Sequence, residues 1–169
     1  PSAGPRALAG AASVLVLHRL VRSWKGEIAA LLAALVFALT PVAALIFRFN
    51  NPDALLTLLL LLATWALWSA LEKGSAWRPA LAGVALGFAF LTKMLMAFMV
   101  LPALALTYLL CGRPRLGTRL LHLAIGGAAL LVSGGWWVAI VELWPDASRP
   151  HVGGTIGDSW TDLILSRSA

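Results

Sequence analysis

Long apolar runs constrain this chain more than any other feature of its sequence. Three of them, Ile28–Phe47, Ala54–Leu71 and Leu120–Val141, come close to the ~20 residues with which a helix crosses the ~30 Å hydrocarbon core of a bilayer. A soluble domain of 169 residues does not carry several such runs. A membrane segment must also satisfy its backbone groups internally, as a helix does. The sequence therefore predicts an all-α fold, a polytopic membrane helix bundle with about six membrane helices.

The basic residues indicate how these helices are oriented. The chain has 13 Lys and Arg residues against 7 Asp and Glu residues, and the basic ones cluster in short loops between the apolar runs. That distribution is typical of membrane proteins, whose cytoplasmic loops are rich in Lys and Arg. We therefore expect membrane lipid around the chain and no nucleic-acid partner.

The segment Pro79–Cys111 decides the topology. Its 33 residues would make one helix of ~50 Å, too long for a single untilted span, with Lys93 near its middle. If two short helices meet near Thr92–Met94 instead, eight of the 13 basic residues share one face: Arg19, Arg22, Lys25, Lys73, Arg78, Arg113, Arg115 and Arg119. We predict two helices, with this basic face in the cytoplasm and Lys93 on the extracytoplasmic face.

Proline and glycine suggest the remaining features of the bundle. The second helix is predicted over Glu27–Phe47, with a kink at Pro41. Residues 1–144 are predicted to form the transmembrane helical region, and residues 145–169 the start of an extracytoplasmic loop or domain. Close helix packing is expected at two groups of glycines: Gly83 and Gly87, and Gly126, Gly127, Gly134 and Gly135.

A compact polar cluster interrupts the apolar sequence ahead of residue 54. It contains Arg48, Asn50, Asn51 and Asp53, and Pro52 favours a chain reversal there. Polar groups are costly in hydrocarbon, so we expect the cluster at a membrane surface or in a protein-lined cavity. Two interpretations remain open. The cluster could bind a substrate hydroxyl or a cation, or it could only cap the helix that follows.

Lys93, Arg149 and His151 are the other candidates for binding a charged substrate. An ammonium group at membrane depth needs an anionic partner, so Lys93 could bind a phosphate; alternatively, it snorkels to the interface. Arg149 and His151 lie in Ser-Arg-Pro-His-Val-Gly-Gly and could contact a charged head group, or they belong to an ordinary solvated loop. His122 lies next to basic residues and is predicted to be interfacial, without a role.

Other chemistry is not recognisable in the sequence. A single cysteine, Cys111, excludes an internal disulfide and forms no metal motif. The sequence shows no nucleophile–base arrangement, phosphate-binding glycine loop or cluster of metal ligands. We therefore expect no metal and no cofactor.

Two stretches resemble a known family of membrane enzymes. They are Arg48–Thr57, Arg-Phe-Asn-Asn-Pro-Asp-Ala-Leu-Leu-Thr, and Gly87–Met94, Gly-Phe-Ala-Phe-Leu-Thr-Lys-Met. In this order and spacing they resemble the polytopic glycosyltransferases of the protein mannosyltransferase and aminoarabinose transferase type, in particular bacterial members. The tail Trp-Pro-x-x-Ser-Arg-Pro-x-x-Gly-Gly is also similar, and the likeness extends over roughly residues 8–157.

The resemblance implies a GT-C fold with an active site facing outward from the bacterial plasma membrane. It implies transfer of a sugar from a polyprenyl-phosphate carrier to a lipid, glycan or protein acceptor. A carboxylate would activate the acceptor hydroxyl, and basic groups would hold the phosphate. Asp53 matches the acidic residue after the family's polar cluster, which makes it a possible catalytic group. Lys93 matches the lysine of the Leu-Thr-Lys motif.

One departure from the family pattern limits what this chain can do. The family's main catalytic carboxylate lies in an earlier outer loop that has no counterpart here, so we expect an internal fragment that is inactive alone. Two other functions stay open. A transporter or flippase could bind an anionic or lipid-linked substrate at a helix broken near Lys93, although no convincing internal repeat supports it. A purely structural membrane subunit would leave Asp53 and Lys93 without a role.

Overall fold

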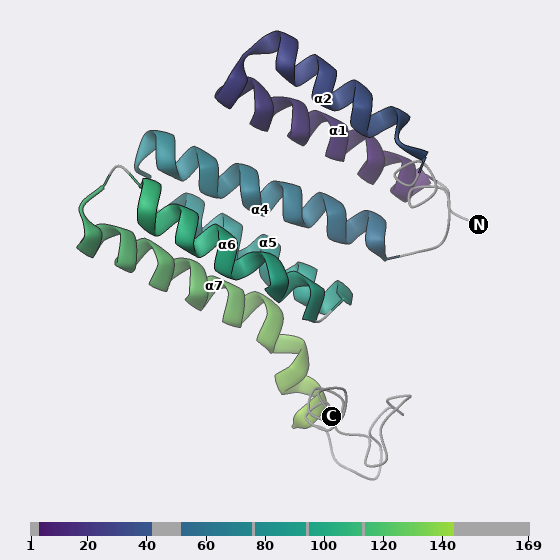
Figure 1. Ribbon diagram of the computed structural model, residues 1–169. Coiled ribbons are helices and arrows are strands. Elements are labelled where there is room, and N and C mark those ends of the chain that lie inside the picture. Colours follow the sequence, from purple (N-terminus) through teal and green to yellow (C-terminus); the bar gives the residue numbers. More distant parts are fainter. Residues whose placement is uncertain (1–3, 42–51, 76, 94, 113, 144–169) are drawn as a thin grey trace.

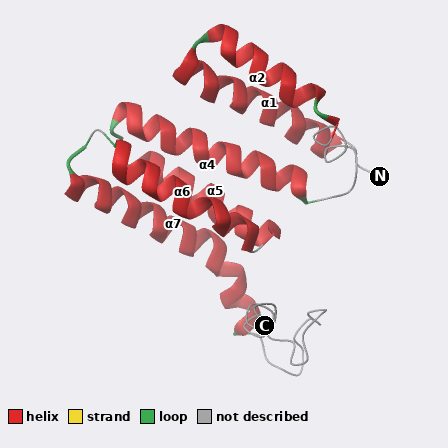
Figure 2. Ribbon diagram, in the orientation of Figure 1, coloured by secondary structure: helices red, strands yellow, loops and turns green. Residues whose placement is uncertain are grey.

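The residues that the structure describes fold into a bundle of six helices, with no strand among them (Figures 1 and 2). The computed structural model describes residues 4–41, 52–75, 77–93, 95–112 and 114–143. The helices are α1 (Gly4–Lys25), α2 (Glu27–Leu39), α4 (Asp53–Lys73), α5 (Trp77–Lys93), α6 (Leu95–Cys111) and α7 (Leu116–Glu142). The prediction of an all-α fold with about six helices is confirmed.

Consecutive helices run in opposite directions, so the connections between them lie at two opposite ends of the bundle (Figure 1). We call one of them the basic end. It is formed by the C-terminal ends of α1, α4 and α6 and by the N-terminal ends of α2, α5 and α7. Seven of the eight basic residues predicted to share a face are described. Arg19 lies in the second-last turn of α1, and the other six lie in the terminal turns and loops of this end: Arg22, Lys25, Lys73, Arg78, Arg115 and Arg119. We call the opposite end the Lys93 end.

The predicted division of Pro79–Cys111 into two helices is confirmed. α5 ends at Lys93 and α6 begins at Leu95, and both pack against α4. The short connections alternate between the two ends of the bundle only because the chain reverses between α5 and α6. A single helix through residue 94 would have carried Arg115 and Arg119 to the Lys93 end.

The closest packing in the bundle is between α5 and α7. A Cβ atom added at Gly83 would overlap the carbonyl oxygen of Gly126 and lie 2.8 Å from its carbon. One at Gly87 would overlap the hydroxyl of Ser133 and lie 2.8 Å from the nitrogen of Gly134. Glycine at these positions lets the two backbones approach, as in other membrane helix pairs.

The glycine prediction is wrong for the other two residues of α7. A Cβ atom at Gly127 or at Gly135 would have nothing within 4 Å. Successive residues point in different directions around a helix, so only one glycine of each adjacent pair faces α5. Gly126 and Gly134 lie eight residues apart and share that face.

The core lies between α4, α5, α6 and α7. Its buried members are mostly alanines and leucines of α4 and α5, together with Tyr108 of α6 and Leu130 of α7. The α1–α2 hairpin joins this core through α1, which packs on α4; the rings of Trp24 and Trp68 are 5.9 Å apart. Small alanines in the core allow the helices to pack closely.

Apolar side chains also cover the outside of the bundle. Leu131 and Val132 of α7 and Ile28 of α2 are more than two-thirds exposed. Two helices, over Asp53–Lys73 and Leu116–Ile140, are long and apolar enough to cross a membrane, and Glu27–Leu39 and Met96–Cys111 are shorter apolar helices. An apolar exterior is costly in water, so these surfaces fit a lipid environment.

The predicted second helix over Glu27–Phe47 is wrong. α2 ends at Leu39, and Thr40 is extended, with φ −66° and ψ 119°. Pro41 explains the early end, because the ring of a proline disfavours the helical region for the residue before it. Pro41 itself is helical again, so the described residues show a break at Thr40, directly before the kink predicted at Pro41. Residues 42–51 lie outside the described residues, as does the predicted outer segment 145–169.

Replacing one packed glycine tests the α5–α7 contact. Gly83→Ala should lower the stability of the full-length protein by about 1–3 kcal/mol, because the added methyl group meets the backbone of α7. Gly135→Ala is the matched control, since its added methyl group enters open space and both substitutions gain the same helix propensity. Thermal unfolding of the protein in detergent measures both. Equal melting temperatures for the two variants would contradict this packing.

Candidate functional site

Two of the residues singled out in the sequence meet at the Lys93 end of the bundle. The ammonium nitrogen Nζ of Lys93 donates to the carboxylate oxygen Oδ1 of Asp53 in an ion pair between residues 40 positions apart in sequence. Asp53 begins α4 and Lys93 ends α5. Because these helices are antiparallel neighbours, the start of one and the end of the other lie at the same end of the bundle.

The start of α4 shows how Asp53 is presented to Lys93. The N-cap position is occupied by Pro52, with φ −61° and ψ −14°, and it has no side-chain capping bond. The hydroxyl of Thr57 donates to the backbone oxygen of Asp53 at 2.8 Å. The carboxylate of Asp53 gains from the positive end of the helix dipole. The same carboxylate also forms the ion pair with Lys93, so its contacts are not confined to the start of α4.

The ion pair rests on a small apolar cluster. Leu56 of α4, Ala89 of α5 and Ala97 of α6 are buried together beneath it. The rings of Phe90 and Phe98 are 5.1 Å apart beside them. Charges next to such a cluster are poorly hydrated, so each partner of the pair offsets the cost of burying the other.

The pair is also reachable from outside. The side chain of Lys93 is 36% exposed and that of Asp53 is 22% exposed. A phosphate could therefore approach the ammonium group while Asp53 still contacts it, since an ammonium group has three N–H donors. The ammonium group of Lys93 could therefore bind an anion, and the carboxylate of Asp53 would hold that ammonium group in place.

The other predicted site residues lie outside the described residues. These are Arg48, Asn50, Asn51, Arg149 and His151. Their roles stay predictions. Among the residues that the structure describes, no three His, Cys, Asp or Glu side chains lie close enough together to hold a metal ion.

The sequence analysis missed a buried polar pair near the basic end. The hydroxyl of Tyr108 on α6 and Nδ1 of His122 on α7 are 2.6 Å apart, and His122 is only 4% exposed. His122 is therefore a buried, hydrogen-bonded side chain, and its predicted depth at the membrane interface stays a prediction. Its spacing from Gly126 and Leu130 places it on the inward face of α7, and this i, i+4, i+8 pattern was the available signal.

Arg119 holds the connection between α6 and α7 beside this pair. Its Nε donates to the carbonyl oxygen of Pro114 at 2.6 Å, and its Nη1 donates to that of Leu109. A cation suits this position because Leu109 lies in the last turn of α6, where carbonyl groups have no partner within the helix.

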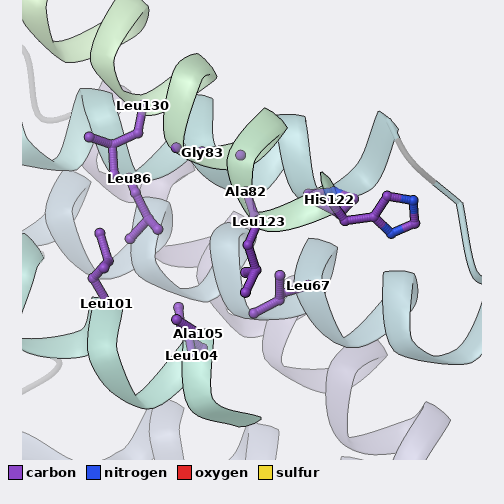
Figure 3. Close-up of a pocket in the computed structure, with 13 residues that line it drawn as sticks. Leu67, Ala82, Gly83, Leu86, Leu101, Leu104, Ala105, His122, Leu123 and Leu130 are labelled. Carbon is purple, nitrogen blue, oxygen red and sulfur yellow. The ribbon is translucent and has the colours of Figure 1, made fainter. Parts of the chain in front are cut away.

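An apolar pocket of about 130 Å³ lies among α4, α5, α6 and α7 (Figure 3). Leucines from all four helices line it, and His122 stands at one end of it. This pocket is closer to the basic end than to Lys93. It is therefore separate from the Asp53–Lys93 pair.

The sequence of the chain matches a family model over most of its length. Residues 3–137 match the family described as dolichyl-phosphate-mannose-protein mannosyltransferase. The chain belongs to this family. Both Asp53 and Lys93 lie within the matched region.

Two proteins of Bacillus subtilis (strain 168) are similar to the chain. "Putative mannosyltransferase YkcB" and "Putative mannosyltransferase YycA" are each 39% identical to it over 161 residues, which is 95% of this chain. The chain spans only 22% and 24% of their respective lengths. No solved structure matches the chain significantly.

A double-mutant cycle on Asp53 and Lys93 tests the ion pair. Asp53→Asn and Lys93→Met should each destabilise the full-length protein, because each removes the ion pair between the two side chains. The double variant should lose less than the sum of the two single losses, with a coupling of about 0.5–3 kcal/mol. Unfolding in detergent measures all four proteins. Additive losses would mean that the two side chains do not interact in the folded protein.

Proposed function

We propose that the chain is part of a membrane glycosyltransferase that moves a sugar from a polyprenyl-phosphate carrier to an acceptor on the extracytoplasmic face of the bacterial plasma membrane. The observation that carries this proposal is the accessible Asp53–Lys93 ion pair in a chain of the mannosyltransferase family. Lipid, glycan and protein acceptors all have a hydroxyl group that such an enzyme could use.

The proposed reaction is a displacement at the anomeric carbon of the sugar. The acceptor oxygen attacks that carbon, and the carrier phosphate leaves with the electrons of the broken bond. Lys93 would hold the phosphate and stabilise the negative charge that it gains. Asp53 would keep the ammonium group in position before the carrier arrives. The main catalytic carboxylate would come from another part of a longer protein, so this chain alone would be inactive.

The proposed orientation follows from the two ends of the bundle. Cytoplasmic loops of membrane proteins are enriched in Lys and Arg, so the basic end would lie in the cytoplasm. A multi-pass bundle of this orientation would expose Lys93 to the outer face, where a carrier-linked sugar and its acceptor meet.

Cys111 offers a direct test of this orientation. It is exposed and lies at the basic end, in the last turn of α6. A membrane-impermeant maleimide should therefore modify the Cys111 peptide in inside-out vesicles and leave it unmodified in intact cells, as measured by mass spectrometry. Denatured membranes provide the control for complete reaction. Modification in intact cells alone would reverse the proposed orientation.

Sugar transfer by the full-length protein tests the proposed activity. Lys93→Met should reduce transfer of a radiolabelled sugar from polyprenyl-phosphate-sugar by about 10²-fold, as loss of one group that stabilises developing charge typically does. Lys73→Met is the matched control, because Lys73 ends α4 at the basic end, far from the proposed site, and should retain transfer.

Each other outcome of this assay has a defined meaning. Normal transfer by Lys93→Met would support the proposed enzyme activity and show that Lys93 is not part of its site. Absence of transfer by the wild-type protein from any polyprenyl-linked donor would favour the transporter or flippase. Retained transfer after both Asp53→Asn and Lys93→Met would make the ion pair purely structural.

A further inference from the structure

The apolar pocket among α4, α5, α6 and α7 has no role in the proposed sugar transfer. Its walls include Leu67, Leu101, Leu104, Leu123 and Leu130, which point toward a common space (Figure 3). These leucines come from α4, α6 and α7. The fourth helix, α5, contributes Gly83 and its neighbours. A space of about 130 Å³ lined in this way is the size of cavity that takes up small apolar molecules.

The pocket reaches the surface of the bundle at Gly127 of α7, which lines it and is exposed. Small residues, Ala105 on α6 and Gly127 on α7, form this side. Gly127 is exposed, and a Cβ atom added there would have nothing within 4 Å. A narrow flexible chain could therefore enter from outside the bundle without displacing a side chain.

The surroundings of the pocket indicate hydrocarbon. Two of its walls, α4 and α7, are the helices long and apolar enough to cross a membrane. Leu67 and Leu130 lie within these two helices, so the pocket would sit at the depth of the lipid chains. Lipid is the medium that meets an opening at this depth.

The end of the pocket nearest the basic end is polar, because His122 lines it, and two arginines lie beyond this end toward the start of α7. His122 closes that end and bonds to Tyr108, which fixes the position of its ring. Arg119 lies one turn earlier on the same face of α7, and Arg115 precedes it in the exposed loop. Arginine guanidinium groups bind phosphate well, because their planar donors match its oxygens.

We propose that this pocket holds a segment of one acyl chain of an anionic phospholipid, with the phosphate of that lipid at the basic end beside Arg119 and Arg115. A space of about 130 Å³ fits a few methylene groups of the chain, and the arginines are complementary to the headgroup. This lipid would be a bound structural partner, distinct from the carrier-linked sugar at the Lys93 end. The inference does not depend on the proposed sugar transfer.

A photoreactive lipid tests the site directly. The full-length protein is reconstituted in nanodiscs of phosphatidylcholine with a small amount of phosphatidylglycerol that carries a diazirine on one acyl chain. After illumination, labelled peptides are mapped by mass spectrometry. Label should concentrate in residues 101–105 of α6 and 123–130 of α7. The same diazirine on phosphatidylcholine should give clearly less label there, because it lacks the net negative charge.

Filling the pocket should remove the label. Gly127→Leu puts an isobutyl group at the rim, and most of the label on the two segments should be lost. Gly135→Leu is the matched control on the same helix, where the added group also enters open space outside the pocket, and its label should remain. Ala105→Leu, from the facing helix, is a second pocket-filling variant that should behave like Gly127→Leu if the first variant fails to fold.

Several results would overturn the proposal. Wild-type protein without label in the pocket would show that another part of the longer chain covers it. Equal labelling by the two lipids would exclude recognition of the headgroup. Displacement of the label by low concentrations of polyprenyl phosphate would assign the pocket to the carrier chain. Label unchanged in a folded pocket-filling variant would place the lipid elsewhere.

Discussion

Close contact between α5 and α7 is the constraint on which the rest of this bundle depends. Gly83 and Gly87 bring the backbone of α5 against Gly126 and Ser133, where even a methyl group would overlap α7. Helices in a lipid environment associate through such packing, because lipid supplies little hydrophobic driving force between them. The contact fixes α5 beside α7, and α4 packs against α5 from another side. The positions of the Asp53–Lys93 pair and of the Tyr108–His122 pair follow from this arrangement.

The ion pair and the apolar pocket lie toward opposite ends of the same four helices. At one end, antiparallel packing of α4 and α5 brings Asp53 to Lys93. Toward the other, α4, α5, α6 and α7 surround the pocket, and the bond between Tyr108 and His122 joins α6 to α7 beside it. The ion pair offers a charged group beside an apolar cluster. The pocket offers an apolar space, with arginines beyond one of its ends, so the two places suit different ligands. The two proposed ligands differ accordingly: the phosphate of a sugar carrier is proposed for one end and a phospholipid for the other.

The sequence predicted much of the fold because membrane helices leave clear signals. The reversal near residue 94 followed from the distribution of basic residues, without any information on packing. The errors have local causes. α2 ends at Leu39 because Pro41 restricts Thr40, and a proline in a sequence does not reveal at which residue the helix is interrupted. Gly127 was assigned to a helix contact because sequence proximity to Gly126 does not show which residue faces the neighbour.

Hydropathy, charge and motif residues determined by themselves the helical class, the division into two ends, and the candidates Asp53 and Lys93. These are properties of short segments, since a helix satisfies its own backbone and its loops carry its charges. The tertiary structure alone decided that Lys93 pairs with Asp53, that His122 is buried against Tyr108, and that a pocket remains between α6 and α7. Those features depend on which helix faces are in contact and how closely, and residues 40 positions apart in sequence carry no local signal of their meeting.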